Sequence, residues 1–588
     1  MKKKYVRWTL WTIASPFILF VILCILIYLP PVQNFLVDKA AVYASEATGM
    51  NISVGRISLS FPLNLVVTDV DAASPHKDTL FSVRRLQVNV QLLPLLKKQV
   101  EVDGISLQGA TVNSNDLIHG MKLNGTLGEL FISSHGVALD PETAIVNKVL
   151  LKDTDLSLCL NDTAAADTAA SDTTYWKIIL QDIDLQNVSF ALDMPLDSLS
   201  LAASLDNATL RDGLIDLHKS AYSLQTFRIK NGRVRYDSGK LLAASPADSL
   251  PSGLDPSHIA LTDIGVKLDS LHYEGRNMKA VISQFVLKER SGLEIVSTTG
   301  RLSSNGKVLR VPSLKLETRD SYLELNAAMD WDVLDFKNEG LVSARLMADI
   351  GKPDVVRFMG SMDEKFVRQY PSEPLRIRTG IDGDLSKLKL TTLAAELPGA
   401  MELFAQGELT HLTDSLLRGG DITLEAETKD LKFVSTLAEG IEIPYGTRLE
   451  GKFTMAGPKM GTDLLLMQPE AQAVAAVDTI PITVYNDSIS VAHDFKMERA
   501  ARLFAKYDLS HDKYEADLAI NHFDLHQFMP ADSLYTLSTR LKVEGEGFDF
   551  FSPRTYFNAE GGIDRFHYGS YHLTGISLAA GLEKSKVH

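Results

Sequence analysis

The sequence contains very little cysteine. Its 588 residues include only two, Cys24 in the most apolar segment of the chain and Cys159 in a stretch that predicts a β-strand. Residues so placed are not expected to pair with each other. A disulfide scaffold and a cysteine-ligated zinc site are therefore both excluded.

Basic charge is also scarce relative to acidic charge. The chain has 59 lysine and arginine residues against 74 aspartate and glutamate residues, which gives a formal net charge of −15. A protein that binds nucleic acid presents a basic face to the phosphates, and no stripe of lysine and arginine stands out in this sequence. We therefore predict no nucleic-acid partner.

Catalytic motifs are missing from the sequence as well. It has no GxSxG elbow, P-loop, HExxH motif or dinucleotide-binding fingerprint. The cluster of His522, Asp524 and His526 could hold a metal ion on either a strand or a helix. A structural role is the stronger interpretation, because Asp524 occupies a repeated helix-cap position and neither Asp354 nor Asp430 has a matching histidine pair. We predict no catalytic residue, no metal, no cofactor and no enzymatic activity.

The N-terminus carries the clearest positive feature. Residues 1–7 are basic, and the stretch from Trp8 to Leu29 has no charged residue over 22 positions. This length spans a hydrocarbon core of about 30 Å, and the basic flank places the N-terminus in the cytoplasm. A cleaved signal peptide is the alternative; it has a shorter apolar core and leaves the rest of the chain in the same compartment.

A second helix is predicted directly after this span. Pro30 and Pro31 end the apolar run, and residues 32–49 carry apolar side chains at helical spacing, as an amphipathic helix does. Gly49 fits the C-terminal end of that helix. The chain therefore changes from helix to another structure near residue 50.

From residue 51 onward the apolar residues recur at every second position. Gly, Asn, Asp and Ser punctuate runs such as LQVNVQLL (86–93) and DIDLQNVSFAL (182–192). This period is typical of strands with one apolar and one polar face, and on the order of 40 of them are expected. An elongated, curved sheet or solenoid with a few short helices accommodates that number. Residues 161–174 and 241–258 lack the period and are predicted to be loops.

The first of these strands defines the candidate apolar surface. In ISVGRISLSFPLNLVVTDV (52–70) the period shifts between Val54 and Ile57, which predicts a bulge, and Pro62 favours an edge or terminal strand. We therefore place this stretch at the membrane-proximal rim of the sheet. The candidate surface residues are Ile57, Leu59, Phe61, Leu63, Leu65, Val67, Leu86, Val88 and Val90.

An internal repeat marks the second half of the chain. ADIGKPDVVRFM (348–359) aligns without gaps on LAINHFDLHQFM (518–529), and ETKDLKFV (427–434) is a weaker copy. The aspartates Asp354, Asp430 and Asp524 are predicted to cap short helices. We therefore divide the chain into a β-rich region, 51–345, and a region of repeated helix-plus-strand units, 346–588.

The passages ATGMNISVGRISLSFPLNLVVTDV (47–70), SVRRLQVNVQLLPLLKKQVEVDGISLQGATV (82–112) and FVLKERSGLEI (285–295), placed after a basic start and an anchor helix, resemble the AsmA-like family of Gram-negative bacteria. Within it they are most similar to the TamB-type branch of the Bacteroidetes, although the family's C-terminal domain is not present. The resemblance implies a curved β-sheet, called a β-taco, with a hydrophobic groove. It also implies an inner-membrane anchor, a periplasmic body and a role in outer-membrane biogenesis.

Two functions stay open at this point. The resemblance implies a conduit for phospholipid between membranes, in which acyl chains lie on the apolar face. The alternative is a scaffold for outer-membrane protein translocation and assembly through a barrel partner of the BamA type, in which the sheet interior is a dry, self-filled core. An extracytoplasmic enzyme is a third reading, and nothing in the sequence supports it.

Overall fold

The structure is a computed structural model of the 588-residue chain. The residues it describes are 50–60, 64–74, 79–91, 102–114, 120–138, 142–160, 175–239, 253–335, 338–360, 362–438, 440–469, 499–549 and 554–583, with residues 39, 41, 42, 45, 484, 485, 488, 489, 552, 586 and 587. Residues 39, 41, 42 and 45 are helical, and the rest of the amphipathic helix predicted for 32–49 lies outside the described residues. The predicted membrane span, 8–29, lies outside the described residues.

In the part of the chain that the structure describes, no helix combines the length and the apolar composition needed to cross a membrane.

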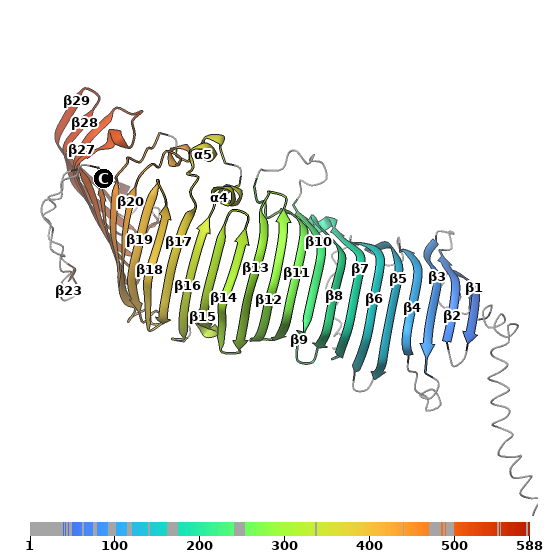
Figure 1. The fold of residues 1–588 in the computed structure, drawn as a ribbon. Coiled ribbons are helices and arrows are strands. Elements are labelled where there is room, and N and C mark those ends of the chain that lie inside the picture. Colours follow the sequence, from blue (N-terminus) through green and yellow to red (C-terminus); the bar gives the residue numbers. More distant parts are fainter. Residues whose placement is uncertain are drawn as a thin grey trace, which may run out of the picture. The chain divides into compact units, whose positions relative to one another are not determined.

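The described chain is mainly β, as predicted (Figure 1). It forms two compact units, residues 1–299 and 300–588, and strand β13 (Glu294–Asn305) contains the boundary. The division at residue 345 suggested by the sequence repeat is a separate one, and it lies within β16 (Leu341–Ile350) of the second unit.

The first unit is a single layer of long strands. Neighbours in the sheet follow the chain order from β1 to β8 and then from β10 to β12, and the short β9 continues the line of β10 between β8 and β11. A 3-10 helix, η1 (Pro195–Asp197), joins β7 to β8. The strands are β1 (Asn51–Ser60), β2 (Asn64–Ala73), β3 (Thr79–Val90), β4 (Val102–Asn113), β5 (Met121–Ala138), β6 (Thr143–Leu160), β7 (Lys177–Met194), β8 (Leu199–Asp216), β9 (Ala221–Leu224), β10 (Thr226–Ser238), β11 (His258–Glu274) and β12 (Asn277–Glu289).

One pair of strands in this unit departs from the antiparallel pattern. β6 and β7 are parallel, with Thr143 opposite Lys177 and Cys159 opposite Asp193. Parallel neighbours cannot be joined by a hairpin turn, so this pair needs a longer connection than the others. The predicted loop 161–174 lies at this position in the sequence and outside the described residues.

The second unit is also a layer of antiparallel strands in chain order, in which β22 pairs with β25. Its strands are β14 (Val308–Thr318), β15 (Tyr322–Asp330), β16 (Leu341–Ile350), β17 (Leu375–Asp384), β18 (Lys387–Leu397), β19 (Met401–Thr410), β20 (Gly419–Thr428), β21 (Arg448–Ala456), β22 (Lys459–Met467), β25 (Ala500–Asp508), β26 (Lys513–Asp524), β27 (Leu534–Glu546), β28 (Tyr556–Tyr568), β29 (Tyr571–Glu583) and β30 (Lys586–Val587). The two-residue strands β23 (Val484–Tyr485) and β24 (Ser488–Ile489) pair only with each other.

Short helical segments interrupt the second layer. They are η3 (Trp331–Asp335), α4 (Lys352–Met359), α5 (Glu364–Gln369), η4 (Val434–Thr436) and η5 (Leu525–Gln527). Figure 1 shows α4 and α5 along the edge where β16 ends. Each of α4, η4 and η5 follows a strand, as the internal repeat predicts.

The estimate of about 40 strands is too high for the described chain, whose strands are numbered to β30. The reason is strand length, since β5, β6, β7 and β8 each have 18 residues. Polar residues that look like turns in the sequence lie in the middle of these strands.

Candidate functional site

The candidate surface residues come together on one face of β1, β2 and β3. Residues directly opposite each other on paired strands share a face. Ile57 is opposite Val67, and Leu59 is opposite Leu65. The next strand continues both lines, with Leu86 opposite Val67, Val88 opposite Leu65 and Val90 two residues further along β3. Phe61 and Leu63 lie outside the described residues.

These positions begin two apolar rows that cross the first unit without interruption from β1 to β12. No charged or polar side chain enters either row. The first row is Ile57, Val67, Leu86, Leu107, Leu130, Leu151, Leu185, Ala208, Ile229, Val266 and Phe285. The second is Leu59, Leu65, Val88, Ile105, Ile132, Val149, Ile183, Leu210, Phe227, Leu268 and Ile282.

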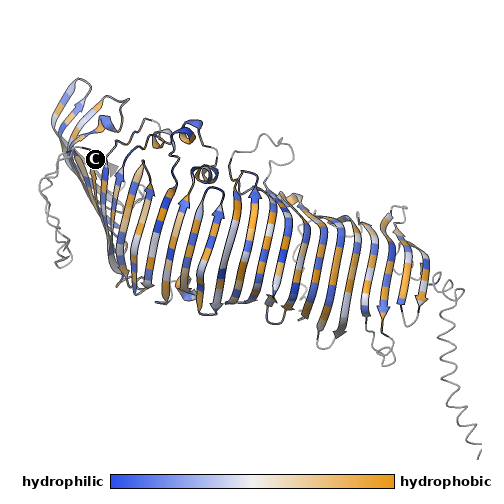
Figure 2. Cartoon of the chain, viewed as in Figure 1, coloured by the Kyte–Doolittle hydropathy of each residue, from blue (hydrophilic) through white to orange (hydrophobic). Residues whose placement is uncertain are grey.

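One row on the opposite face of the same strands is polar. Arg56 on β1 is opposite Thr68 on β2, and the line continues with Arg85 on β3. Its further members are Gln108, Glu129, Lys152, Gln186, Asn207 and Lys230. This row is therefore hydrated, and Figure 2 shows hydrophilic and hydrophobic residues alternating along the strands.

Next to the apolar rows runs a line of residues that we call the crease. At this line the pairing skips one residue on both strands, for example between the pairs Val54–Val70 and Arg56–Thr68. The crease consists of Gly55, Asp69, Arg84, Gly109, Gly128, Asp153, Asn187, Asp206 and Asn231. The period shift predicted at Gly55 is thus present, but it is not a one-residue bulge, because neither strand gains a residue over its neighbour.

Backbone conformation explains the composition of the crease. Asp69, Asp153, Asn187 and Asn231 have φ between 50° and 55°, and Gly109 has φ 62°. Aspartate, asparagine and glycine are the residues that tolerate this left-handed region. In β2, β4, β6, β7 and β10 this left-handed residue lies at the point where the alternation of the strand is reset. Apolar residues that are two positions apart on either side are therefore three apart across the crease.

The apolar face of the first unit is only partly shielded from solvent. The leucine, isoleucine, valine and phenylalanine residues of its two rows are half-buried, and among the described residues no helix packs over them. A self-filled core would bury such side chains almost completely. A single layer of strands with one face open to solvent is consistent with the partial burial that is observed.

The second unit has an apolar face of the same kind. One row runs from β15 to β29 and contains no charged residue. It consists of Leu325, Leu346, Thr379, Leu393, Ala405, Leu424, Gly451, Leu464, Leu503, Leu518, Leu541, Gly561 and Leu578.

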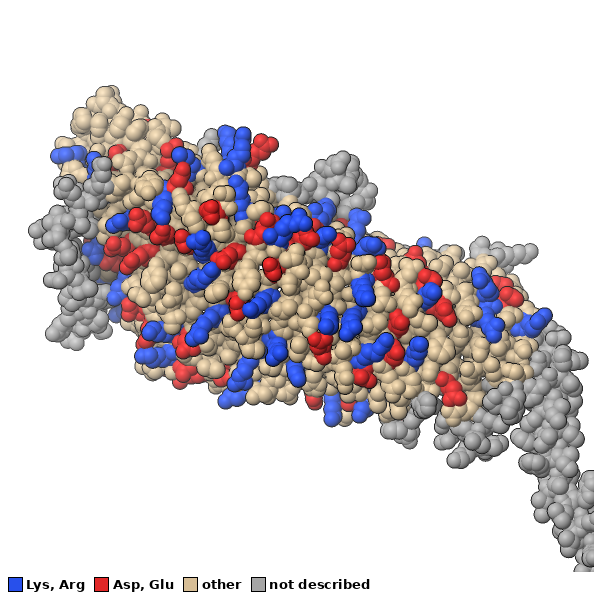
Figure 3. Space-filling model, in the orientation of Figure 1, with Lys and Arg blue, Asp and Glu red and all other residues tan. Residues whose placement is uncertain are grey.

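Charged residues of the second unit pair across strands on the other face. Arg378 Nη2 lies 2.7 Å from Asp349 Oδ1, and Arg502 Nη2 lies 2.5 Å from Asp463 Oδ2. Figure 3 shows lysine and arginine interspersed with aspartate and glutamate on the surface in view. The pair of Arg378 with Asp349 is exposed and contributes little to stability, whereas the side chains of Arg502 and Asp463 are half-buried.

At one edge of the second unit the apolar face is covered. Phe366 and Tyr370, which are 1% and 6% exposed, pack with Leu397, Leu431 and Phe433. The rings of Phe366, Tyr370 and Phe433 contact one another with centroid distances of 5.1 to 5.7 Å. This cluster contains the largest buried side chain of the described chain.

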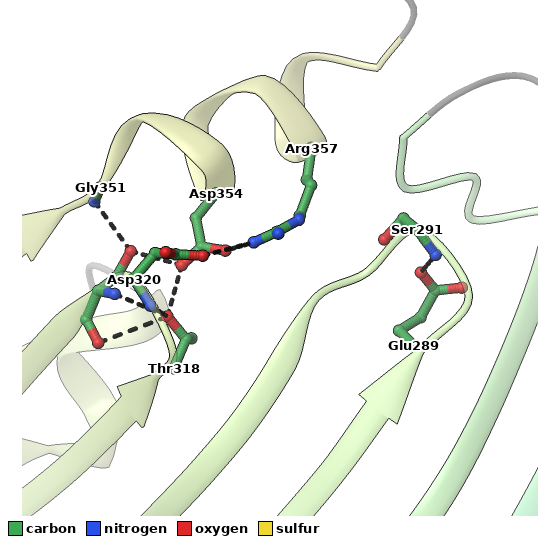
Figure 4. A network of polar contacts seen from close by, with 8 residues as sticks. Glu289, Ser291, Thr318, Asp320, Gly351, Asp354 and Arg357 are labelled. Carbon is green, nitrogen blue, oxygen red and sulfur yellow. Dashed lines mark hydrogen bonds and ion pairs between the residues drawn. The ribbon is translucent and has the colours of Figure 1, made fainter. Parts of the chain in front are cut away.

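A buried polar network holds α4 above the β14–β15 turn (Figure 4). Asp354 is 1% exposed and accepts hydrogen bonds from Thr318 Oγ1, from Ser321 Oγ at 2.6 Å and from Arg357 Nη1 at 2.6 Å. Arg357 Nη1 also donates to Asp320 Oδ2 at 2.9 Å. Burial alone would raise the pKa of Asp354, but these hydrogen bonds outweigh it and place the pKa below its usual value.

The three aspartates predicted to cap short helices occupy different positions in the structure. Asp354 is not a cap, because Gly351 holds the N-cap position of α4 and Asp354 lies inside the first turn. Asp524 is the N-cap of η5 and accepts the backbone N–H of His526 at 3.2 Å. Asp430 accepts the N–H of Lys432 at 3.2 Å, at the turn that precedes η4.

The histidines near Asp524 do not converge on one point. The His522 ring is within 2.8 Å of Asn521 Oδ1, whereas the His526 ring stacks on Tyr535 with a centroid distance of 4.8 Å. Asp524 directs its carboxylate to the backbone of His526 and to Gln527 Nε2. Within the described residues, no group of histidine, cysteine and carboxylate side chains has a metal-binding arrangement.

No protein-family model and no curated protein matches this sequence.

Proposed function

We propose that the protein is a membrane-anchored lipid conduit that carries phospholipid along its apolar face between two membranes. The observation that carries the proposal is the uninterrupted, half-buried apolar surface of the first unit. Its two rows contain no charge from β1 to β12. An acyl chain that moves along such a surface meets no charged side chain.

The energetics favour a bound apolar ligand. An exposed apolar patch that extends over many strands is unfavourable in water unless something covers it. Each methylene group of an acyl chain removed from water contributes about 0.8 kcal/mol. A row of apolar side chains on successive strands offers such contacts at every 4.7–4.9 Å step across a sheet, so the ligand can advance by small steps.

The proposed setting follows from the sequence. The span 8–29 would anchor the chain once in the inner membrane, with the N-terminus in the cytoplasm and the sheet in the periplasm. We assign the chain to the AsmA-like family, in the TamB-type branch, as part of this proposal. No catalytic step or cofactor is required, since the surface acts by binding alone.

Mass spectrometry of lipid retained by the purified full-length chain tests the proposal. We expect phospholipid to copurify with the wild-type chain and to be lost from Leu107→Asp, because Leu107 lies within the first apolar row, with apolar neighbours on both sides. The matched control is Ser106→Asp, its neighbour on the opposite face, which should retain lipid. Circular dichroism of both variants checks that the sheet is intact. Absence of lipid from the wild-type chain, or equal lipid in both variants, contradicts the proposal.

A scaffold for outer-membrane protein assembly is the second candidate, and one observation favours it. Among the described residues, β29 pairs with β28 along its length, and on its other side it pairs with β30 at Leu582 and Glu583 alone. Tyr571, Leu573 and Leu578 of β29 are 66%, 40% and 42% exposed. An exposed strand edge suits pairing with a strand of a BamA-type barrel. A scaffold of this kind predicts that Leu107→Asp leaves assembly unaffected.

A further inference from the structure

The chain segment between β16 and β17, residues 351–374, is not needed to complete the sheet. Ile350 at the end of β16 is already opposite Leu375 at the start of β17, and all ten residues of each strand pair. A short turn could join them. The chain instead inserts α4 and α5, which have eight and six residues, and helices of this length are marginal without tertiary contacts. We call residues 351–374 the cover.

The cover packs on the apolar face. Phe366 and Tyr370 belong to one buried cluster with Leu397 and Ala400, and Met401 packs against this cluster. Leu397 is opposite Met401, two residues along from the pair Ala395–Leu403, so both belong to the apolar side of β18 and β19. Leu397 is 3% exposed, whereas the leucines of the apolar rows of the first unit are half-buried. The cover therefore occupies surface that a lipid chain would use.

Polar contacts rather than a large core attach the first half of the cover. Asp354 joins α4 to Thr318 and Ser321 of the β14–β15 turn. At the other end of α4, Phe358 and Met359 are 60% and 44% exposed, and Gly360 has φ 76°. Loss of the Asp354 contacts would leave α4 with few buried apolar contacts of its own.

We propose that the cover is an intramolecular competitor of lipid: it closes the end of the apolar face of β17–β19 where Leu375, Leu397 and Met401 lie, Asp354 holds it closed, and its release opens that surface to an acyl chain. This inference rests on the proposed lipid function. The ligand it excludes is the apolar chain of a phospholipid, because the displaced contacts are those of two aromatic rings with leucine, alanine and methionine side chains.

Photo-crosslinking with p-benzoylphenylalanine in the full-length chain, expressed in a Gram-negative host, tests the competition. One reporter replaces Leu403, beside the cover, and a second replaces Leu107 in the first unit. In the wild-type background we expect phospholipid adducts at position 107 and few at position 403. In Asp354→Asn, adducts at position 403 should rise by roughly fivefold or more, since buried charge-assisted hydrogen bonds are lost. Adducts at position 107 should not change.

The control variant is Asp349→Asn, which removes an exposed ion pair with Arg378 on the hydrated face and should leave both reporters at wild-type levels. Phe366→Ser provides a second route to an open cover and should reproduce the effect of Asp354→Asn. Hydrogen exchange must show faster exchange in residues 352–370 and unchanged protection in β17. Equal adducts at position 403 in the wild-type chain and in both open variants would overturn the proposal.

Failure of the lipid function gives a different result. If position 107 forms no adduct in any background, the conduit is rejected, and the cover is then judged with the dye 1-anilinonaphthalene-8-sulfonate. An exposed apolar face should increase the dye fluorescence of Asp354→Asn over that of Asp349→Asn. Equal fluorescence of the two variants rejects the cover as well.

Discussion

Gly128 on β5 lies opposite Asp153 on β6 at the crease, and a Cβ atom added to Gly128 would lie 2.8 Å from the Cβ of Asp153. The same relationship holds between Gly55 and Asp69, where a Cβ atom added to Gly55 would lie 3.0 Å from the Cβ of Asp69. Adjacent strands approach so closely at the crease that one residue of each of these pairs has no side chain. The two glycines are therefore required by packing between strands, since neither has a positive φ.

We predict that Gly128→Ala destabilises the first unit by about 1 to 3 kcal/mol, the usual cost of forcing extra atoms into a packed position. The methyl group would meet Asp153 and the carbonyl oxygen of Lys152. Thr126→Ala, an exposed position on the same strand, should change stability by no more than about 0.5 kcal/mol. Thermal unfolding of both variants measures the difference, and equal melting temperatures would argue against close contact at the crease.

Asn187 gives a prediction about backbone conformation at the same line. Its φ is 50°, and its Nδ2 donates to Asp153 Oδ1 at 2.9 Å. Asn187→Val should cost about 1 to 2 kcal/mol or more, because a β-branched residue is strained in the left-handed region. Asn187→Gly loses only the exposed hydrogen bond and should be tolerated. Chemical denaturation ranks the variants, and a valine variant as stable as the glycine variant contradicts the conformational argument.

Asp354 gives a prediction about pH. Its folded-state pKa is depressed, so it stabilises the second unit fully above the unfolded value of about 3.9 and this contribution is lost as pH falls through the lower folded value. Asp354→Asn removes the charge at every pH and should cost about 1 to 3 kcal/mol at pH 7. The stability difference between wild type and variant should therefore shrink on acidification below pH 4.

The measurement is unfolding of both chains across this pH range, with Asp349→Asn as the control. The ion pair of Asp349 with Arg378 is more than one-third exposed on both sides and should contribute no more than about 1 kcal/mol. A wild-type advantage over Asp354→Asn that persists unchanged into acid would show that the carboxylate charge is not what holds α4.

The two-residue period of the strands and its shift next to Gly55 could be predicted from the sequence. That the shift recurs on neighbouring strands and forms the crease could not. The spacing of Val54 and Ile57 reveals a break in one strand. That the break lies in line with Asp153 and Asn187 depends on strand register, which the period alone does not specify. The parallel pairing of β6 with β7 is hidden for the same reason, since both strands alternate as antiparallel strands do.

The misassigned role of Asp354 has a different cause. An aspartate before a short apolar helix fits a cap, and that interpretation holds for Asp524. At α4 the helix begins earlier, because Gly351 takes the N-cap position and Pro353 lies in the first turn. Asp354 then points to Thr318 and Ser321, more than 30 residues away, and no local pattern records that contact.

The crease also divides each long strand into two halves, in which the apolar residues fall on odd-numbered positions in one half and on even-numbered positions in the other. In β7, Ile183 and Leu185 hold odd positions before Asn187, whereas Val188, Phe190 and Leu192 alternate with the other parity after it. A hydropathy signal summed over the whole strand at a fixed period of two largely cancels. The chain's mean hydropathy of +0.01 does not reveal the alternation either, although the apolar and polar residues alternate within each half-strand. Sequence searches that assume unbroken alternation will therefore underestimate how regular such a sheet is.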